Sequence, residues 1–164
     1  STLYSGIVSG FNNNVNHAIN GDQVQSDMFS LYAGATINTG VKGLKVGLAY
    51  DYVSGGSGLG STVDPFWVDV LGGYLSYQAT EKLSLHVRGE YLWSSMSGGS
   101  SSMGGLGGFP GSVVSGTATI QYDLWANVLS RLEFRWDHAA DNTKPFYLED
   151  QDSFLLALNV IYKF

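Results

Sequence analysis

Ser84, His86 and Glu90 are residues of the types that hydrolytic enzymes use as nucleophile, general base and orienting acid, and they share one parity in an alternating segment. In an extended strand, spacings of two and four residues separate backbone positions by about 7 and 13 Å. Those distances are too long for an unaided catalytic triad. The sequence therefore predicts no enzyme activity, and we interpret His86 as a hydrogen-bonding residue on a polar face.

Carboxylates concentrate between the predicted strands, where their oxygens could bind Ca²⁺ or Mg²⁺ and bridge lipopolysaccharide phosphates. No spacing among them matches the EF-hand ladder, and the chain has no cysteine for a thiolate site. We prefer simple solvation of these acids, and of His17 and His138 in or beside the same loops, so no metal or cofactor is predicted. The acids are Asp22, Asp27, Asp64, Asp141, Glu149, Asp150 and Asp152, against Lys144.

Most other charged residues alternate with large apolar residues, which is the period of a β-strand with two different faces. Segment 127–138 is the clearest case: Val128, Leu132, Phe134 and Trp136 occupy even positions, and Arg131, Glu133, Arg135 and Asp137 occupy odd ones. The segments that begin at 43, 81 and 112 repeat this pattern. The first segment is less clear, and so is the one at 66, where Asp69 shares parity with the apolar Leu71 and Leu75.

Extending this pattern along the chain predicts eight strands in a single domain, residues 1–164. The expected strands are 2–12, 28–38, 43–53, 66–79, 81–94, 112–125, 127–138 and 152–164. Long connections (13–27, 54–65, 95–111 and 139–151) alternate with tight ones at 39–42, near Thr80 and near Ala126. Such asymmetry is typical of outer-membrane barrels, which have short periplasmic turns and long external loops. The glycine- and serine-rich stretch 94–112 is interpreted as a flexible loop tip.

The composition agrees with a membrane barrel. Only 13% of the 164 residues are charged, against roughly 25% in an average soluble protein. No apolar run approaches the roughly 20 residues of a membrane-spanning helix. The start of the chain lacks signal-peptide features, so we expect either that the numbering begins after cleavage of a leader or that the leader is missing from this chain. A net charge of −6 argues against nucleic-acid binding. The alternative is a soluble β-sandwich whose apolar faces form a core.

Aromatic residues at both ends of the apolar parity favour the barrel, because aromatic girdles flank the apolar band of such proteins. Phe154 and Phe164 are ten residues apart, or roughly 25 Å of membrane height for a tilted strand. The predicted girdle residues are Tyr50, Tyr52, Tyr91, Trp93, Trp136 and Phe154 at the outer interface, and Tyr77, Tyr122, Tyr162 and Phe164 at the inner one.

The fold prediction is therefore an all-β, eight-stranded antiparallel up-and-down transmembrane β-barrel, closed by its eight strands, with both termini periplasmic. The predicted lumen-lining charges are Lys45, Asp51, His86, Arg88, Glu90, Asp123, Arg131, Glu133, Arg135 and Asp137. An eight-stranded barrel is about wide enough inside for side chains alone. Two interpretations remain open: an interior salt-bridge network that fills the barrel, or a narrow charge-lined solute path.

The chain ends in LLALNVIYKF, which places Leu158, Val160, Tyr162 and Phe164 on one parity. A terminal phenylalanine behind alternating apolar residues is similar to the signal that the outer-membrane barrel-assembly machinery reads. A free strand can be recognised by addition to a sheet edge, through its main chain and alternate side chains. We expect the last strand to contact this machinery during insertion.

The stretches LEFRWDHAADNTKPF (132–146) and DQDSFLLALNVIYKF (150–164) resemble the two C-terminal strands of the OmpL-like β-barrel porins of Gram-negative bacteria, and SGIVSGFNNN (5–14) is similar to a strand-to-loop element of that family. Family members are longer than this chain. The resemblance implies an outer-membrane protein for passive passage of small solutes or ions, in contact with lipid and lipopolysaccharide. The alternative is a closed barrel that serves as membrane anchor, surface-binding protein or scaffold, as a monomer or in a larger complex.

Overall fold

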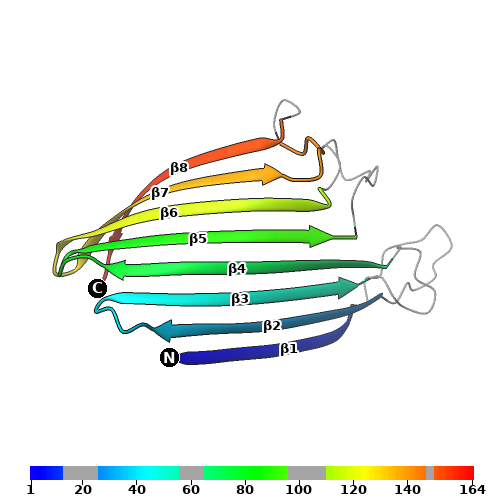
Figure 1. The fold of residues 1–164 in the computed structure, drawn as a ribbon, viewed down its shortest axis with the longest axis horizontal. Coiled ribbons are helices and arrows are strands. Elements are labelled where there is room, and N and C mark those ends of the chain that lie inside the picture. Colours follow the sequence, from blue (N-terminus) through cyan, green and yellow to red (C-terminus); the bar gives the residue numbers. More distant parts are fainter. Residues whose placement is uncertain (13–25, 56–64, 96–109, 147–149) are drawn as a thin grey trace.

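A computed structural model describes residues 1–12, 26–55, 65–95, 110–146 and 150–164. These residues form one antiparallel sheet of eight strands whose spatial order follows the sequence (Figure 1). The strands are β1 (Thr2–Asn12), β2 (Ser26–Asn38), β3 (Leu44–Gly55), β4 (Phe66–Gln78), β5 (Leu83–Ser94), β6 (Ser112–Trp125), β7 (Val128–Ala139) and β8 (Asp152–Tyr162). The all-β, up-and-down prediction is confirmed. In the described segments, no helix has the length and apolar character to cross a bilayer.

The predicted strand bounds differ from the observed ones by at most two residues. Each strand is 11 to 14 residues long, longer than the five or six residues common in soluble sheets and sufficient for a tilted transmembrane strand. Alternation of apolar and polar residues sets these lengths, because the pattern stops where glycine- and acid-rich segments begin.

Short turns join β2 to β3, β4 to β5 and β6 to β7 at one end of the sheet, which we call the short-turn end, and both termini lie there (Figure 1). Gly43 has a φ of 82° in the first of these turns and its carbonyl accepts a hydrogen bond from the Gln78 amide at 2.9 Å. A side chain there would be strained. The last turn follows a register shift between Asp123 and Trp125. We call the opposite end the loop end.

Strand pairing gives the sheet two chemically different faces, because directly opposed residues point to the same side. One row crosses five strands through Lys45, Ser76, His86, Thr119 and Glu133. The next row crosses them through Val46, Leu75, Val87, Ala118 and Phe134. We call these the polar face and the apolar face.

The apolar face is not covered by protein within the described residues. Leu48, Leu156 and Leu158 are 61%, 70% and 73% exposed, and the only buried apolar residues described are Leu129 and Ala139. A soluble sandwich would bury these leucines against a second sheet. The apolar face is instead continuous and open, as a lipid-facing surface must be.

The predicted closure by eight strands is not found. Among the described residues, β1 pairs only with β2 and β8 only with β7, so both outer strands leave one backbone edge unpaired. Closure at eight would crowd this face's tyrosines and arginines into an interior about wide enough for side chains alone. In the open sheet they lie along the wall.

Candidate functional site

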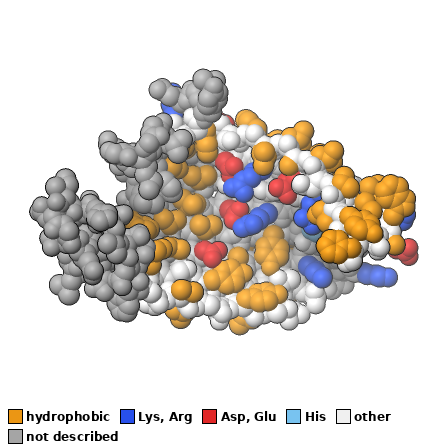
Figure 2. Space-filling model, turned by 180° about the vertical axis from the view of Figure 1, so that it is seen from behind, with side chains coloured by type: hydrophobic (Ala, Val, Ile, Leu, Met, Phe, Trp, Pro, Cys, Tyr) orange, Lys and Arg blue, Asp and Glu red, His pale blue; other side chains and the backbone are white. Residues whose placement is uncertain are grey.

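The polar face carries all ten residues that the sequence predicts to line a lumen, on strands β3, β5, β6 and β7. By strand register, Lys45, Asp51, His86, Arg88, Glu90, Asp123, Arg131, Glu133, Arg135 and Asp137 share this side of the sheet. Figure 2 shows charged side chains gathered over its hollowed centre. The rigid β-ladder fixes their depth, so this face is the strongest candidate for a functional surface.

Arg88 and Glu90 form an ion pair along β5, with Arg88 Nη2 and Glu90 Oε1 2.5 Å apart. The two residues are two positions apart and therefore on the same face, about 7 Å apart along the strand, within reach of an arginine side chain. The Arg88 side chain is 57% exposed. The Glu90 side chain is 15% exposed, so the pair meets solvent mainly through the guanidinium.

Arg135 and Asp137 repeat the arrangement on β7, with Arg135 Nη2 and Asp137 Oδ1 2.8 Å apart. The Ser115 hydroxyl donates to Asp137 Oδ1 at 2.5 Å, and Arg135 Nε also donates to the carboxylate. Both pairs thus run along a strand. Neither of these two pairs links one strand to another.

His86 and Ser84 do not form a catalytic pair. The Ser84 hydroxyl donates to Gln78 Oε1 at 2.9 Å, while His86 Nδ1 lies 3.0 Å from Ser76 Oγ. His86 has the hydrogen-bonding role that the sequence predicts. At middle depth, the Thr119 hydroxyl donates to Glu133, and the Arg131 guanidinium donates to Gln121. These contacts orient side chains without assembling a nucleophile and a base.

Sequence reasoning missed two tyrosines that lie against glycines on the polar face. A Cβ added at Gly47 would lie 2.0 Å from the Tyr74 ring, and one at Gly34 would lie 2.6 Å from the Tyr32 hydroxyl. The Tyr74 hydroxyl also hydrogen-bonds Thr36 Oγ1 at 2.5 Å. Aromatic rings often cover strand glycines in this way. For Tyr74 the available signal was a glycine directly opposite it on the neighbouring strand, whereas Tyr32 covers a glycine two residues further along its own strand.

Two hollows on the polar face have volumes of about 260 and 280 Å³, and Tyr74 and Arg88 line both. His86, Glu133 and Arg135 complete the first hollow, and Asp51 and Glu90 the second. Aromatic, cationic and anionic groups therefore meet solvent at the centre of the wall. Such a surface can contact passing ions or small polar solutes.

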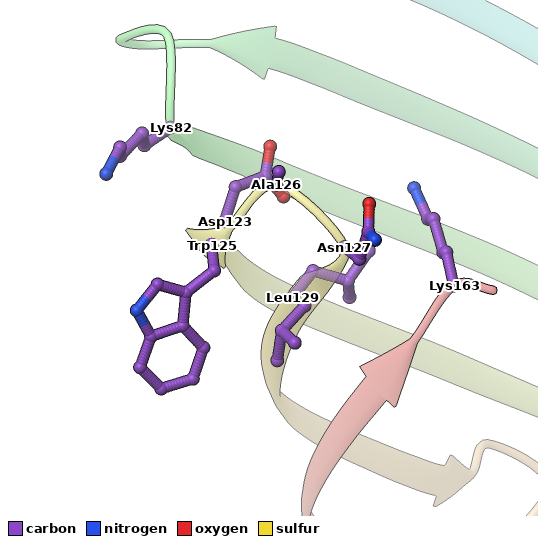
Figure 3. A pocket seen from close by; sticks show the side chains of 8 residues that line it. Lys82, Asp123, Trp125, Ala126, Asn127, Leu129 and Lys163 are labelled. Atoms are coloured by element: carbon purple, nitrogen blue, oxygen red, sulfur yellow. The ribbon is translucent and has the colours of Figure 1, made fainter.

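A third hollow, of about 230 Å³, lies at the short-turn end (Figure 3). Lys82 and Lys163 flank the β6–β7 turn there, and Asp123 and Trp125 also line the hollow. Trp125 is 71% exposed. The two lysines point apart, so they make a cationic rim and not a convergent anion site.

The predicted girdle residues that come before Tyr162 in the chain all lie on the apolar face. They are Tyr50, Tyr52, Tyr77, Tyr91, Trp93, Tyr122, Trp136 and Phe154. The rings of Tyr91 and Trp93 stack at 5.5 Å, and those of Phe134 and Phe154 at 6.2 Å. Tyr and Trp suit an interface because each has an apolar body and a polar tip.

The acid that interrupts this face, Asp69, accepts a hydrogen bond from the Tyr50 hydroxyl and is only 8% exposed. Near the loop end, Asp152 Oδ1 accepts a hydrogen bond from Trp136 Nε1 at 2.7 Å and lies 3.0 Å from His138 Nδ1. The sequence interpretation of Asp152 and His138 as simply solvated therefore needs correction. Both acids are held by aromatic partners, because a carboxylate beside the apolar band needs hydrogen-bond donors.

The last strand exposes its apolar row almost completely. Val160 and Tyr162 are 66% and 62% exposed, and Phe164 lies beyond the end of β8. On the other face of β8, Leu155 is 52% exposed. These residues belong to the unpaired edge, where an incoming strand would cover them.

Asp141 organises the described part of the β7–β8 connection. Its carboxylate accepts hydrogen bonds from the Gly111 amide at 2.5 Å and from the Thr143 hydroxyl at 2.6 Å. Burial alone would raise the pKa of Asp141, but these donors together lower it below the ordinary 3.8. In the described part of the chain, no three His, Asp or Glu residues are grouped to hold a metal ion. The predicted loop acids Asp22, Asp64 and Glu149, His17, and most of the 94–112 stretch lie outside the described residues.

Comparison with known families decides the class. A family model described as putative beta-barrel porin-2, OmpL-like, matches residues 1–164. The chain belongs to this porin family. Membership places the open sheet in the β-barrel class and supports a bacterial outer-membrane location and a transport or structural role. A search among curated proteins found no match.

Proposed function

We propose that this porin passes small solutes or ions passively across the outer membrane, along a lumen lined by the polar face. The observation that carries the proposal is the direction of its ion pairs. Arg88–Glu90 and Arg135–Asp137 run along their strands and remain partly exposed. Charges that pair along a wall leave the space in front of that wall to water, whereas pairs across an interior would fill it.

The hollows beside Arg88 and Tyr74 support the same function. They present both signs of charge and an aromatic ring, which suits weak contacts with many small polar solutes. Conduction needs contacts weak enough for the solute to leave. We therefore propose that solutes pass passively and that none of them is bound tightly.

For orientation in the membrane, we propose that the short-turn end faces the periplasm. Both termini lie at this end, and short periplasmic turns with longer external loops are typical of outer-membrane barrels (Figure 1). The exposed row of Leu158, Val160 and Tyr162 on β8 suits recognition by the barrel-assembly machinery through strand addition. Outer-membrane lipid and lipopolysaccharide are the proposed partners of the apolar face.

Planar-bilayer recording of the purified, refolded protein tests passage directly. We expect stepwise current, and a compact gel band in detergent that shifts on boiling. Arg135→Gln removes one cation from the polar face, so the K⁺/Cl⁻ permeability ratio should rise by roughly 2-fold. A folded, heat-modifiable protein that never conducts would contradict the proposal and favour a closed barrel that acts as anchor or scaffold.

A further inference from the structure

Charge is distributed unevenly along the polar face, from one end of the strands to the other. Lys45, Lys82, Arg131 and Lys163 lie toward the short-turn end, where Asp123 is on the same face and Glu81 lies in the β4–β5 turn. Asp51, Glu90 and Asp137 lie further toward the loop end, together with Arg88 and Arg135, whereas Glu133 lies near middle depth. Figure 2 shows a similar trend: most acidic side chains lie nearer the loop end and basic ones extend toward the short turns, where an acidic side chain is also visible.

Ion pairing sharpens this difference. Within the described residues, both arginines of the acidic half are paired with carboxylates of that half, Arg88 with Glu90 and Arg135 with Asp137. Asp51 is the acid left without an ion pair there. At the other end, the described contacts give Lys45, Lys82 and Lys163 no carboxylate partner within salt-bridge distance. The uncompensated charge is thus negative toward the loops and positive toward the short turns.

The two regions are far enough apart to act separately. Lys45 and Asp51 are six residues apart on β3 and on the same face, which corresponds to about 20 Å along the strand and about 15 Å along the axis of a tilted barrel. That separation exceeds the Debye length of about 10 Å in 0.1 M salt. Each end of the wall therefore sets its own local potential.

We infer that this porin conducts asymmetrically, with the larger current when the loop side is electrically positive. The inference rests on the proposed passive passage and adds a direction to it. With that polarity, cations enter across the acidic end and anions across the basic end, so both accumulate between the two ends and conductance rises. With the opposite polarity, each ion must enter at the end that repels it, and the centre of the lumen is depleted.

Single-channel recording in about 0.1 M KCl at matched positive and negative voltages measures the asymmetry. We expect the two currents to differ by roughly 1.5-fold in 0.1 M salt and by less than about 1.1-fold in 1 M salt, where the Debye length falls to about 3 Å. Orientation is read independently: the chain has no cysteine, so Lys144→Cys supplies a unique thiol at the loop end. A bulky, membrane-impermeant maleimide in one chamber then identifies the loop side through reduced current.

An exchange variant isolates the cause. Lys45→Asp combined with Asp51→Lys moves one cation and one anion to opposite ends of the same strand face, with net charge unchanged. We expect its current ratio to fall close to one. Glu133→Gln, which removes a charge near middle depth, is the matched control and should keep a ratio clearly above one.

Equal currents of both signs in the unmodified porin at low salt would overturn this inference while leaving passive passage intact. A larger current with the loop side negative would overturn it as well. Absence of current steps from a correctly folded barrel would overturn the proposed function and, with it, this inference.

Discussion

The polar face is built in two ways on the two halves of the sheet. On β2–β4, tyrosines lie over glycines, as Tyr74 does over Gly47, and the wall carries few charges. On β5 and β7, arginines pair with carboxylates along the strand, as Arg135 does with Asp137. The apolar face is similar on both halves. Lipid therefore requires the same apolar side chains across the whole apolar face. The polar face instead has tyrosine rings packed on glycines in one half and ion pairs in the other.

The comparison of faces predicts the largest effect. Ile120→Lys puts a cation on the apolar face near the middle of β6, and Thr119→Lys puts the same cation on the polar face one residue earlier. We expect Ile120→Lys to lower the free energy of unfolding by about 2–4 kcal/mol. Thr119→Lys should cost much less, because its ammonium can reach Glu133. Urea unfolding in lipid vesicles measures both, and equal costs would contradict the assignment of faces.

The glycine-dependent half can be disrupted without changing any charge. Gly47→Ala forces the Tyr74 ring off its glycine and weakens the hydrogen bond to Thr36, so we expect a loss of about 1–3 kcal/mol in unfolding free energy. Gly89→Ala is the matched control, because a Cβ there meets nothing within 4 Å. If both variants unfold at the same urea concentration, Tyr74 does not depend on the glycine beneath it.

The charged half should be less sensitive to loss of one pair. A double-mutant cycle with Arg135→Gln and Asp137→Asn should give a coupling energy below about 1 kcal/mol, because the pair is partly exposed. Vesicle unfolding of the four proteins supplies this coupling. A value of several kcal/mol would mean that the pair is buried in the membrane-inserted barrel, as in the side-chain-filled alternative.

The smallest expected effect concerns the β7–β8 connection. The pKa of Asp141 is lowered in the folded state, so its stabilising contribution is complete above the ordinary value of 3.8 and is lost as the pH falls through the lowered pKa. Amide exchange at Gly111, whose N–H donates to Asp141, should speed up over that acidic range. Asp141→Asn should exchange faster at neutral pH and lose this pH dependence. Identical exchange at Gly111 in the two proteins would rule out a stabilising hydrogen bond from the Gly111 amide to Asp141.

Sequence alone predicted the strands and their faces well, because lipid on one side forces a two-residue alternation that can be read directly. Arg131, Glu133 and Arg135 fall on the polar face for this reason. Contacts within the polar face were not predictable from parity. The parity of a residue does not show that Arg135 pairs with Asp137 on its own strand. It also does not show that the Tyr74 ring packs on Gly47. The register between strands decides those contacts.

The open edges were also unpredictable, because strand count alone does not fix curvature. Eight strands suffice for a small barrel, yet β1 and β8 each pair with a single neighbour among the described residues. Asp69 shows a further limit: a lone acid on an apolar parity looks like an error in the pattern until the Tyr50 hydroxyl beside it is seen.

The unpaired edges determine the order of assembly. The seven strand pairings seen among the described residues all join consecutive strands. Each pairing can therefore form outward from the connection between its two strands, at a small cost in chain entropy. Among the described residues, the outer edges of β1 and β8, each 11 residues long, have no such pairing, so each is covered only when a further strand joins it. We expect that step to follow the pairing of consecutive strands. Until it happens, these edges are the part of the molecule most open to capture, whether by a folding catalyst or by aggregation.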